Sequence, residues 1–168
     1  RSPPMRAAAA DVRTLPFRDG SFDGVLSVST LDHFATHSEI AAALGEIRRV
    51  LRRNGSLILT LDNLWNPAVT VRNALPFPLL ESLGIVPYRV GATCGPTRLR
   101  RMVKEAGFEV LACDGLMHIP RVIAVAVSRL LRRSSPETRA RFLKTLRACE
   151  VLRAWPSRHI TGNFIAIH

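Results

Sequence analysis

Residues 22–62 read FDGVLSVSTLDHFATHSEIAAALGEIRRVLRRNGSLILTLD, and this stretch decides the fold. Two short apolar runs, residues 22–29 and 56–62, flank a segment whose apolar side chains recur at helical spacing, at Ile40, Leu44, Ile47 and Leu51. This pattern predicts a strand, a helix and a second strand joined by short connections. Such a βαβ unit makes the two strands parallel, and we expect both to be buried on both faces.

Polar residues mark the ends of this predicted helix. Ser38 can cap its start, and Asn54-Gly55 can close its end in a left-handed turn. On the N-terminal side, the small apolar run Ala7–Ala10 could be the end of another strand.

The rest of the chain alternates between irregular and regular segments. Residues 63–96 contain Pro76, Pro78 and Pro87, which prevent a long helix, although Asn66-Pro67 has the residues of a helix start. This stretch is either a binding loop or a packing segment. Further predicted elements are a helix capped by Thr97 and ended by Gly107, a strand over 108–113, helices over 116–133 and from Ser135-Pro136 to about 153, and a strand in the final NFIAIH.

The positive charge is concentrated in one part of the chain. The 168 residues carry 24 basic and 13 acidic side chains, a net charge of +11, and 22 of the basic residues are Arg. Residues 1–62 have a net charge of +1, residues 63–114 of +2 and residues 115–168 of +8. Aromatic side chains do not interleave with the Arg clusters, as they do in proteins that bind single-stranded nucleic acid. A solvated basic face is the default interpretation, and we expect no nucleic-acid partner.

Three widely spaced cysteines form neither a disulfide framework nor a zinc motif, and the sequence suggests no other metal site. A reducing, cytoplasmic location fits this composition. The longest apolar stretch, residues 122–127, is far shorter than a membrane span, so we expect no integral membrane segment. The sequence sets no oligomeric state.

Several short motifs together resemble one enzyme family. They are Asp11, Leu15-Pro16-Phe17, Asp19-Gly20, Ser21-Phe22-Asp23, Leu31-Asp32-His33 and Arg49-Val50-Leu51, followed by Gly55. This series resembles the middle of a class I S-adenosylmethionine (SAM)-dependent methyltransferase, and is most similar to the small-molecule branch that includes the ubiquinone and menaquinone methylating enzymes. Residues 97–112 and 162–168 resemble the family's later segments more loosely.

The resemblance implies an α/β fold: a partial Rossmann-like sheet, mostly parallel with an antiparallel last strand, helices on both faces and a helical cap. It also implies the cofactor SAM and methyl transfer to a small-molecule acceptor. Its residue-by-residue match places Asp11 and the backbone N–H of Val12 at the adenine ring. The match places Ser29, Thr30 and Leu31 at the methionine part of the cofactor.

Two residues after the first strand are candidates for the chemistry. Asp32 carries a carboxylate that suits a positive sulfonium, and His33 could accept a proton from the methyl acceptor. Many methyl transfers need alignment more than a base, so a catalytic base need not exist. Candidates for contacts with the acceptor or a lid are Asn63, Trp65, Asn66, Tyr88, Arg89 and His118. Each could instead be structural.

The family's glycine-rich turn after its first strand is missing, since no Gly-x-Gly occurs in the sequence. The chain begins with Arg1, and the residues before Asp11 cannot supply the family's first two strands. We therefore expect residues 1–168 to be one N-terminally incomplete methyltransferase-like domain, with variable insertion or cap segments at 63–96 and 116–160. Its strands would correspond to the family's fourth, fifth, seventh and sixth strands, which are neighbours in the sheet. The edge of the fourth strand and one face of the sheet would then be exposed.

Two other classes of function stay open at this point. The chain could be a non-catalytic methyltransferase-like module or a subunit completed by a partner. It could also be a binder of nucleic acid or a membrane surface that works through its basic last third.

The missing glycine turn generates one prediction. The 168-residue chain alone should bind SAM weakly or not at all, because the family uses that turn to bring backbone close to the cofactor. Isothermal titration calorimetry measures this affinity, and a dissociation constant in the low micromolar range would contradict the expectation.

Overall fold

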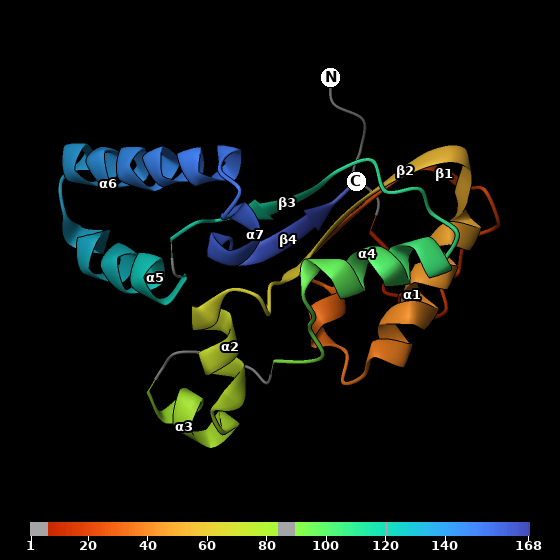
Figure 1. Ribbon diagram of the computed structural model, residues 1–168, viewed down its shortest axis with the longest axis horizontal. Helices are drawn as coiled ribbons and strands as arrows, with labels where there is room; N and C mark the ends of the chain where they lie inside the picture. The colour runs from red at the N-terminus through yellow and green to blue at the C-terminus, as the bar shows by residue number, and fades with distance from the viewer. Residues whose placement is uncertain (1–6, 84–89, 120) are drawn as a thin grey trace.

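A computed structural model describes residues 7–83, 90–119 and 121–168 and contains a four-stranded sheet (Figure 1). The strands are β1 (Phe22–Val28), β2 (Leu51–Asp62), β3 (Cys113–Leu116) and β4 (Phe164–Ile167), in the spatial order β1-β2-β4-β3. β1 and β2 are parallel, whereas β4 is antiparallel to both β2 and β3. The predicted α/β class, strand order and antiparallel last strand are confirmed.

Helix α1 (His37–Val50) connects β1 to β2, and it differs from the prediction only at its ends. Thr36, not Ser38, is the N-cap: its hydroxyl accepts from the N–H of Glu39, and the Glu39 carboxylate accepts from the N–H of Thr36. The helix ends at Val50. Asn54 has the predicted left-handed backbone with φ 64°, but it lies in an irregular part of β2 where the register with β1 shifts.

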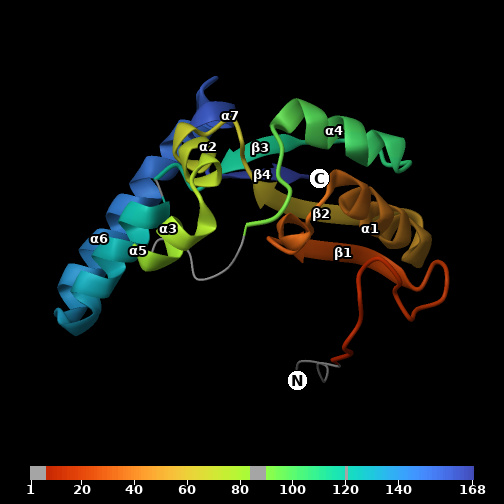
Figure 2. The same ribbon diagram turned by 90° about the horizontal axis from the view of Figure 1, so that it is seen from below.

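Helix α4 (Pro96–Glu105) lies beside α1 on the same side of the sheet (Figures 1 and 2). Gly95 is its N-cap, with Pro96 at the first position, so the expected Thr97 cap is wrong. Gly107, the predicted end of this helix, follows it with a left-handed backbone, φ 85°. The two helices and the sheet face beneath them form the core, whose fully buried side chains include Leu31, Ile40, Leu44, Ile47, Leu59, Leu61, Leu99 and Ile165.

The opposite face of the sheet is open along β1 and β2. Leu26, Val28 and Ile58 are 68%, 58% and 44% exposed. The expectation that both strands are buried on both faces is therefore wrong for this chain, and no described helix covers this side of β1 and β2. The exposed sheet face that the sequence analysis expects is present. Residues 7–10, the expected strand end, are exposed and have no regular structure.

The third strand starts later than the sequence predicts. Residues 108–112 have no strand structure, although the N–H groups of Leu111 and Ala112 donate to the carbonyl of His168. Pairing with β4 begins at Cys113.

Short helices fill the two segments that flank α4 and β3. Residues 63–96 contain α2 (Pro67–Ala74), capped by Asn66 as predicted, and α3 (Phe77–Ser82), so this stretch is less irregular than expected. After β3 come α5 (Arg121–Leu130), η2 (Leu131–Arg133), α6 (Pro136–Cys149), η3 (Glu150–Ala154) and α7 (Arg158–Thr161). The predicted helix over 116–133 thus starts at Arg121. No helix in the described residues is long and apolar enough to span a membrane.

Close packing of two glycines joins α7 to β3. A Cβ on Gly115 would overlap the carbonyl oxygen of Arg158, and Gly162 lies directly against Gly115. Gly45, in the middle of α1, is exposed and faces open space.

This contrast predicts opposite effects for one substitution. Gly115→Ala should destabilise the fold by about 2 kcal/mol, because backbone atoms must move to admit the methyl group. Gly45→Ala should stabilise it by about 1 kcal/mol through helix propensity. Urea unfolding of both variants measures the difference, and a Gly115→Ala variant as stable as the wild type would contradict the packing described.

Candidate functional site

The carboxyl ends of β1 and β2 lie side by side, because the strands are parallel and Val28 pairs with Thr60. Beyond β1, Ser29 takes a left-handed backbone with φ 45° and its N–H donates to the Thr60 hydroxyl at 3.0 Å. The chain then turns into the short helix η1 (Leu31–His33). In open α/β sheets, ligands bind at this edge.

Asp32 is buried at this edge, and its Oδ1 has no hydrogen-bond partner among the described residues. Burial raises the pKa of the Asp32 carboxyl, and the nearby Asp62 carboxylate raises it further, while the charge of His33 acts in the opposite direction. The segment before α4 contacts η1: the N–H of Gly91 donates to the Asp32 carbonyl at 2.9 Å. His33 itself is exposed.

Asp62 ends β2 and forms a buried ion pair with Arg72 of α2, with 2.5 Å between Oδ2 and Nη2. The Thr93 hydroxyl donates to the Asp62 carbonyl and fixes the end of the strand. Two carboxylates thus share one arginine. Arg72 forms an ion pair with Asp62, and its charge also acts on Asp32 without direct contact. The edge is therefore electrostatically suited to a cation.

A small hollow adjoins the ion pair. Its volume is about 110 Å³, and it is lined by Arg72, Asn73, Leu75, Phe77, Leu80, Val90 and Gly91. Most of these side chains are apolar, and Gly91 is the residue that bonds to Asp32. The hollow thus has room for a small apolar group close to the two carboxylates.

A second groove, of about 300 Å³, follows the free edge of β1. Val12, Leu15, Phe17, Phe22, Val25, Ser27 and Thr30 are among the residues that line it. The Ser27 hydroxyl is buried without a partner among the described residues. Within the described part of the chain, the N–H of Val12 makes no hydrogen bond. An apolar groove with unused donors suits a flat, nitrogen-rich ring.

The Asp11 carboxylate is already engaged by Arg13, whose Nη2 lies 2.6 Å from Oδ2. This hydrogen bond lowers the pKa of Asp11 and keeps it an acceptor. Arg13 also pairs with Glu39 at 2.5 Å and lies over the ring of Phe34, 5.0 Å from its centroid. A ligand at Asp11 would share the carboxylate with Arg13.

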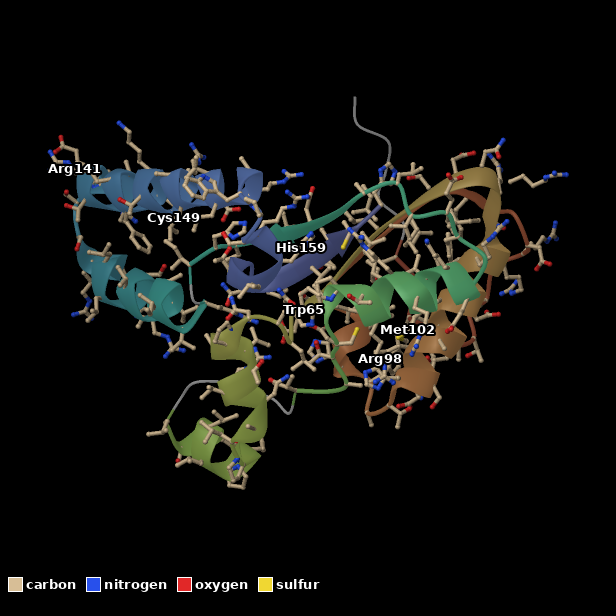
Figure 3. All side chains as sticks on the ribbon, viewed as in Figure 1. Trp65, Arg98, Met102, Arg141, Cys149 and His159 are labelled. Atoms are coloured by element: carbon tan, nitrogen blue, oxygen red, sulfur yellow. The ribbon has the colours of Figure 1, made fainter. Side chains whose placement is uncertain are left out.

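The two asparagines after β2 use their amides within the chain. Asn63 donates to the carbonyls of His159 and Gly162, and Asn66 donates to that of Thr161 while its oxygen caps α2. These contacts favour a structural role for both. Trp65, between them, is 48% exposed and lies against Gly95 at the start of α4 (Figure 3).

Both ring nitrogens of His118 already have partners within the chain. Its side chain is buried, with Nδ1 2.8 Å from the Thr161 hydroxyl and Nε2 3.2 Å from the Gly115 carbonyl. Tyr88 and Arg89 lie outside the described residues.

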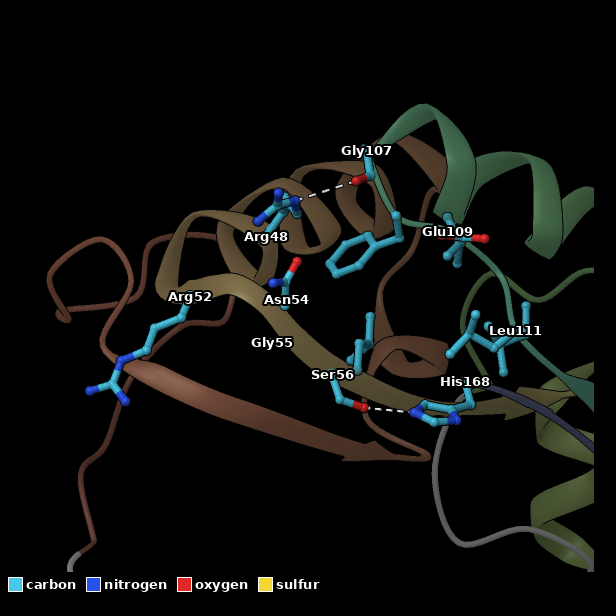
Figure 4. A pocket seen from close by; sticks show the side chains of 13 residues that line it. Arg48, Arg52, Asn54, Gly55, Ser56, Gly107, Glu109, Leu111 and His168 are labelled. Carbon is cyan, nitrogen blue, oxygen red and sulfur yellow. Dashed lines mark hydrogen bonds between the residues drawn. The ribbon is translucent and has the colours of Figure 1, made fainter.

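Another cavity, of about 280 Å³, lies at the opposite end of β2 (Figure 4). Ser56 Oγ and His168 Nε2 lie 2.7 Å apart on its wall, and Arg48 donates to the Gly107 carbonyl. Because it adjoins the amino end of β2, it is at the wrong edge for the ligand of a doubly wound sheet.

Comparisons with known proteins relate part of the chain to methyltransferases. Residues 1–59 match a family described as a methyltransferase domain. The chain is 38% identical over 55 residues to a tRNA (carboxymethyluridine(34)-5-O)-methyltransferase of Xenopus tropicalis, a match that covers 33% of this chain and 9% of that protein. It is 38% identical over 53 residues to a human protein named probable tRNA methyltransferase 9B, covering 32% of this chain and 12% of that protein.

Solved structures extend the likeness in fold to 94–95% of the chain. A SAM-dependent methyltransferase from Thermotoga maritima superposes with a TM-score of 0.54 and 17% identity, over 94% of this chain and 60% of that one. The fold is that of a SAM-dependent methyltransferase. The [4+2]-cyclase SpnF superposes with a TM-score of 0.55 and 18% identity, over 95% of this chain and 54% of its own, so this fold also serves other chemistry. The chain therefore spans small parts of its curated relatives and little more than half of these structures.

The site contains residues that the sequence motifs did not single out. Arg72, Thr93 and Gly91 follow β2 by 10 to 31 residues and meet Asp32 and Asp62 only in the folded chain. Asp62 could have been found, since it is a carboxylate at the end of a buried strand. The other three carry no signal in a single sequence.

The raised pKa of Asp32 generates a stability prediction. At a pH below the usual carboxyl range, Asp32 is protonated in both the folded and the unfolded chain and carries no penalty. As the pH rises, the unfolded chain loses this proton first, so the wild type loses stability relative to Asp32→Asn. The free energy of unfolding of the variant minus that of the wild type should therefore increase as the pH rises above about 4, as urea titrations at a series of pH values measure.

Asp11→Asn is the matched control, because the pKa of Asp11 is lowered by Arg13. The free energy of unfolding of Asp11→Asn minus that of the wild type should decrease as the pH rises, opposite to the change for Asp32→Asn. Equal slopes for the two variants would contradict the burial assigned to Asp32.

Proposed function

We propose that the intact protein transfers a methyl group from SAM to a small-molecule acceptor, with this chain as its C-terminal, acceptor-side part. The observation that carries the proposal is the edge formed by Asp32 and Asp62, where a buried carboxylate oxygen of Asp32 has no partner among the described residues and Arg72, the partner of Asp62, lines a small hollow. The methyltransferase fold and the match of residues 1–59 support the cofactor.

The residues of this chain fit that cofactor at two places. The groove along β1 would take the adenine ring, with Val12 as donor and Asp11 as acceptor, and Ser29, Thr30 and Leu31 would lie along the methionine part. SAM supplies a methyl group on a positively charged sulfur. The unpartnered Oδ1 of Asp32 suits a cationic neighbour, because an unsatisfied buried carboxylate is costly without one.

The acceptor would approach from the side of α2 and α3. There the hollow beside Arg72 holds its apolar part, and the exposed ring of Trp65 borders the same edge of the sheet. Alignment of the acceptor nucleophile is the main requirement for the displacement. The acceptor nucleophile would form a bond to the methyl carbon that SAM supplies as the carbon–sulfur bond breaks, so that sulfur leaves as a neutral thioether, and the proton of the nucleophile would pass to His33 or to water.

Segments 63–96 and 116–160 would then set the choice of acceptor, as variable parts of a single methyltransferase-like domain. The relatives named as tRNA methyltransferases share about a third of this chain, so their acceptors do not carry over to the remaining two thirds. The small volume of the hollow, about 110 Å³, favours a small molecule over a nucleotide in RNA. The ubiquinone- and menaquinone-methylating branch, acting in the cytoplasm, stays our specific expectation.

The test uses the longest natural polypeptide that contains this sequence, incubated with methyl-labelled SAM. One set of reactions contains small phenols, amines and quinols, and another contains total tRNA. The proposal expects label in the small-molecule extract. Label only in precipitated RNA would replace the small-molecule acceptor with tRNA, and no label in either would overturn the methyl transfer.

Asp32→Asn should lower kcat/KM for this transfer about tenfold or more, because it removes a charge placed at the sulfonium. Asp23→Asn is the control, since the side chain of Asp23 is 81% exposed at the amino end of β1. Equal activity of the two variants would remove Asp32 from the site.

A further inference from the structure

The helices α5 and α6 form a hairpin that stands away from the sheet (Figure 1). Neither helix contains a buried residue, and η2 between them contains none. Partly buried side chains recur at three- or four-residue spacing along both helices, at Ala124, Val127, Leu131, Phe142, Leu146 and Cys149. One stripe on each helix is therefore shielded, and the rest of the hairpin surface is open.

Four large aliphatic side chains are exposed on α5. Val122, Ile123, Val125 and Leu130 are 46%, 56%, 40% and 80% exposed. They lie on one broad side of the helix, away from the stripe of Ala124 and Val127. An apolar helix face of this kind marks a surface that binds a partner.

Basic side chains border this apolar face. Arg129, Arg132 and Arg133 follow within and just after α5, and there is no acidic residue from 121 to 136. In α6, Arg141 lies toward the end of the helix that is far from the sheet (Figure 3). None of these four arginines makes an ion pair within the described residues. In contrast, Arg153 and Arg158 at the base of the hairpin pair with Asp114.

We propose that the outer face of this hairpin docks on an anionic lipid bilayer, with the aliphatic side chains of α5 in the interface and the arginines at the lipid phosphates. A basic amphipathic helix has the composition of such surface-bound segments. A second copy of the chain is a less suitable partner, because pairing of two such faces would bring the arginines of both copies together. An RNA partner would use the arginines but not the aliphatic face, because nucleic-acid bases stack on aromatic side chains.

The base of the hairpin adjoins the candidate site. Asn66 donates to the Thr161 carbonyl and Asn63 to the His159 carbonyl, which ties α7 to the end of β2. Docking of the hairpin would therefore bring the edge with Asp32 and Asp62 close to the bilayer. An acceptor that resides in the membrane would then lie close to this edge. The docking itself does not depend on methyl transfer.

Co-sedimentation of the 168-residue chain with phosphatidylcholine vesicles, with and without phosphatidylglycerol, tests the docking. The chain should bind the anionic vesicles and not the neutral ones. Arg132→Glu with Arg133→Glu should lower the partition coefficient at least about tenfold, because each basic residue contributes through lipid charge. Ile123→Ser with Leu130→Ser should lower it by about tenfold through the loss of apolar insertion.

Two control variants match these changes elsewhere in the chain. Arg53→Glu with Arg98→Glu changes the net charge equally on exposed residues outside the hairpin, and Leu26→Thr with Val28→Thr alters the open sheet face. Both should bind the anionic vesicles like the wild type. Circular dichroism confirms that each variant is folded.

Three results would overturn the proposal: equal loss in the hairpin and control variants, binding that is insensitive to the hairpin variants, or the absence of vesicle binding. Binding of the wild type to RNA with the same arginine dependence but no loss in the Ile123 and Leu130 variant would assign the hairpin to nucleic acid. The readout needs no cofactor or acceptor, so a failure here leaves the proposed methyl transfer untouched.

Discussion

The parallel pairing of β1 with β2 is the constraint on which the rest of the molecule depends. Parallel neighbours need a crossover, and α1 provides it on one face of the sheet. The crossover buries Ile40, Leu44 and Ile47 against the strands, and it places both carboxyl ends at one edge. Asp32 and Asp62 therefore become neighbours although 30 positions separate them in the sequence. Their proximity follows from topology and not from local sequence.

The electrostatic character of that edge follows from an unequal number of charges. Arg72 neutralises Asp62 through a short, buried pair, and Asp32 has no comparable partner in the described residues. A lone buried carboxylate is unfavourable for folding, and the raised pKa of Asp32 expresses this. Groups in such positions are common at functional sites, because selection for binding maintains them against their cost to stability.

Regular elements with strong periodicity could be predicted from the sequence, and elements that depend on distant partners could not. Helix α1 follows from the spacing of Ile40, Leu44 and Ile47. Its cap was misplaced because Thr36 and Ser38 are both good capping residues, and only Thr36 has Glu39 at the position that completes the reciprocal pair. The strand expected at 108–113 begins instead at Cys113, because β4 determines which residues find hydrogen-bond partners.

The candidate site shows the same division. The motifs around Leu31-Asp32-His33 located one half of it, since those residues are consecutive after a strand. The other half comes from Arg72, Gly91 and Thr93, which reach the edge through the loops around α2 and α3. His118 shows the converse case. In the sequence it is a candidate for contact with the acceptor, but in the structure its two ring nitrogens contact the Thr161 hydroxyl of α7 and the Gly115 carbonyl of β3.

The distribution of charge gains meaning only with the fold. The last third of the chain carries a net charge of +8, and in the sequence this excess could be an ordinary solvated surface. In the structure, Arg153 and Arg158 are tied to Asp114 at the base of the hairpin, whereas Arg129, Arg132 and Arg133 flank exposed aliphatic side chains. Solvation alone does not explain the exposed Ile123 and Leu130, since a merely soluble helix would carry polar residues there. The basic and apolar features therefore belong to one surface.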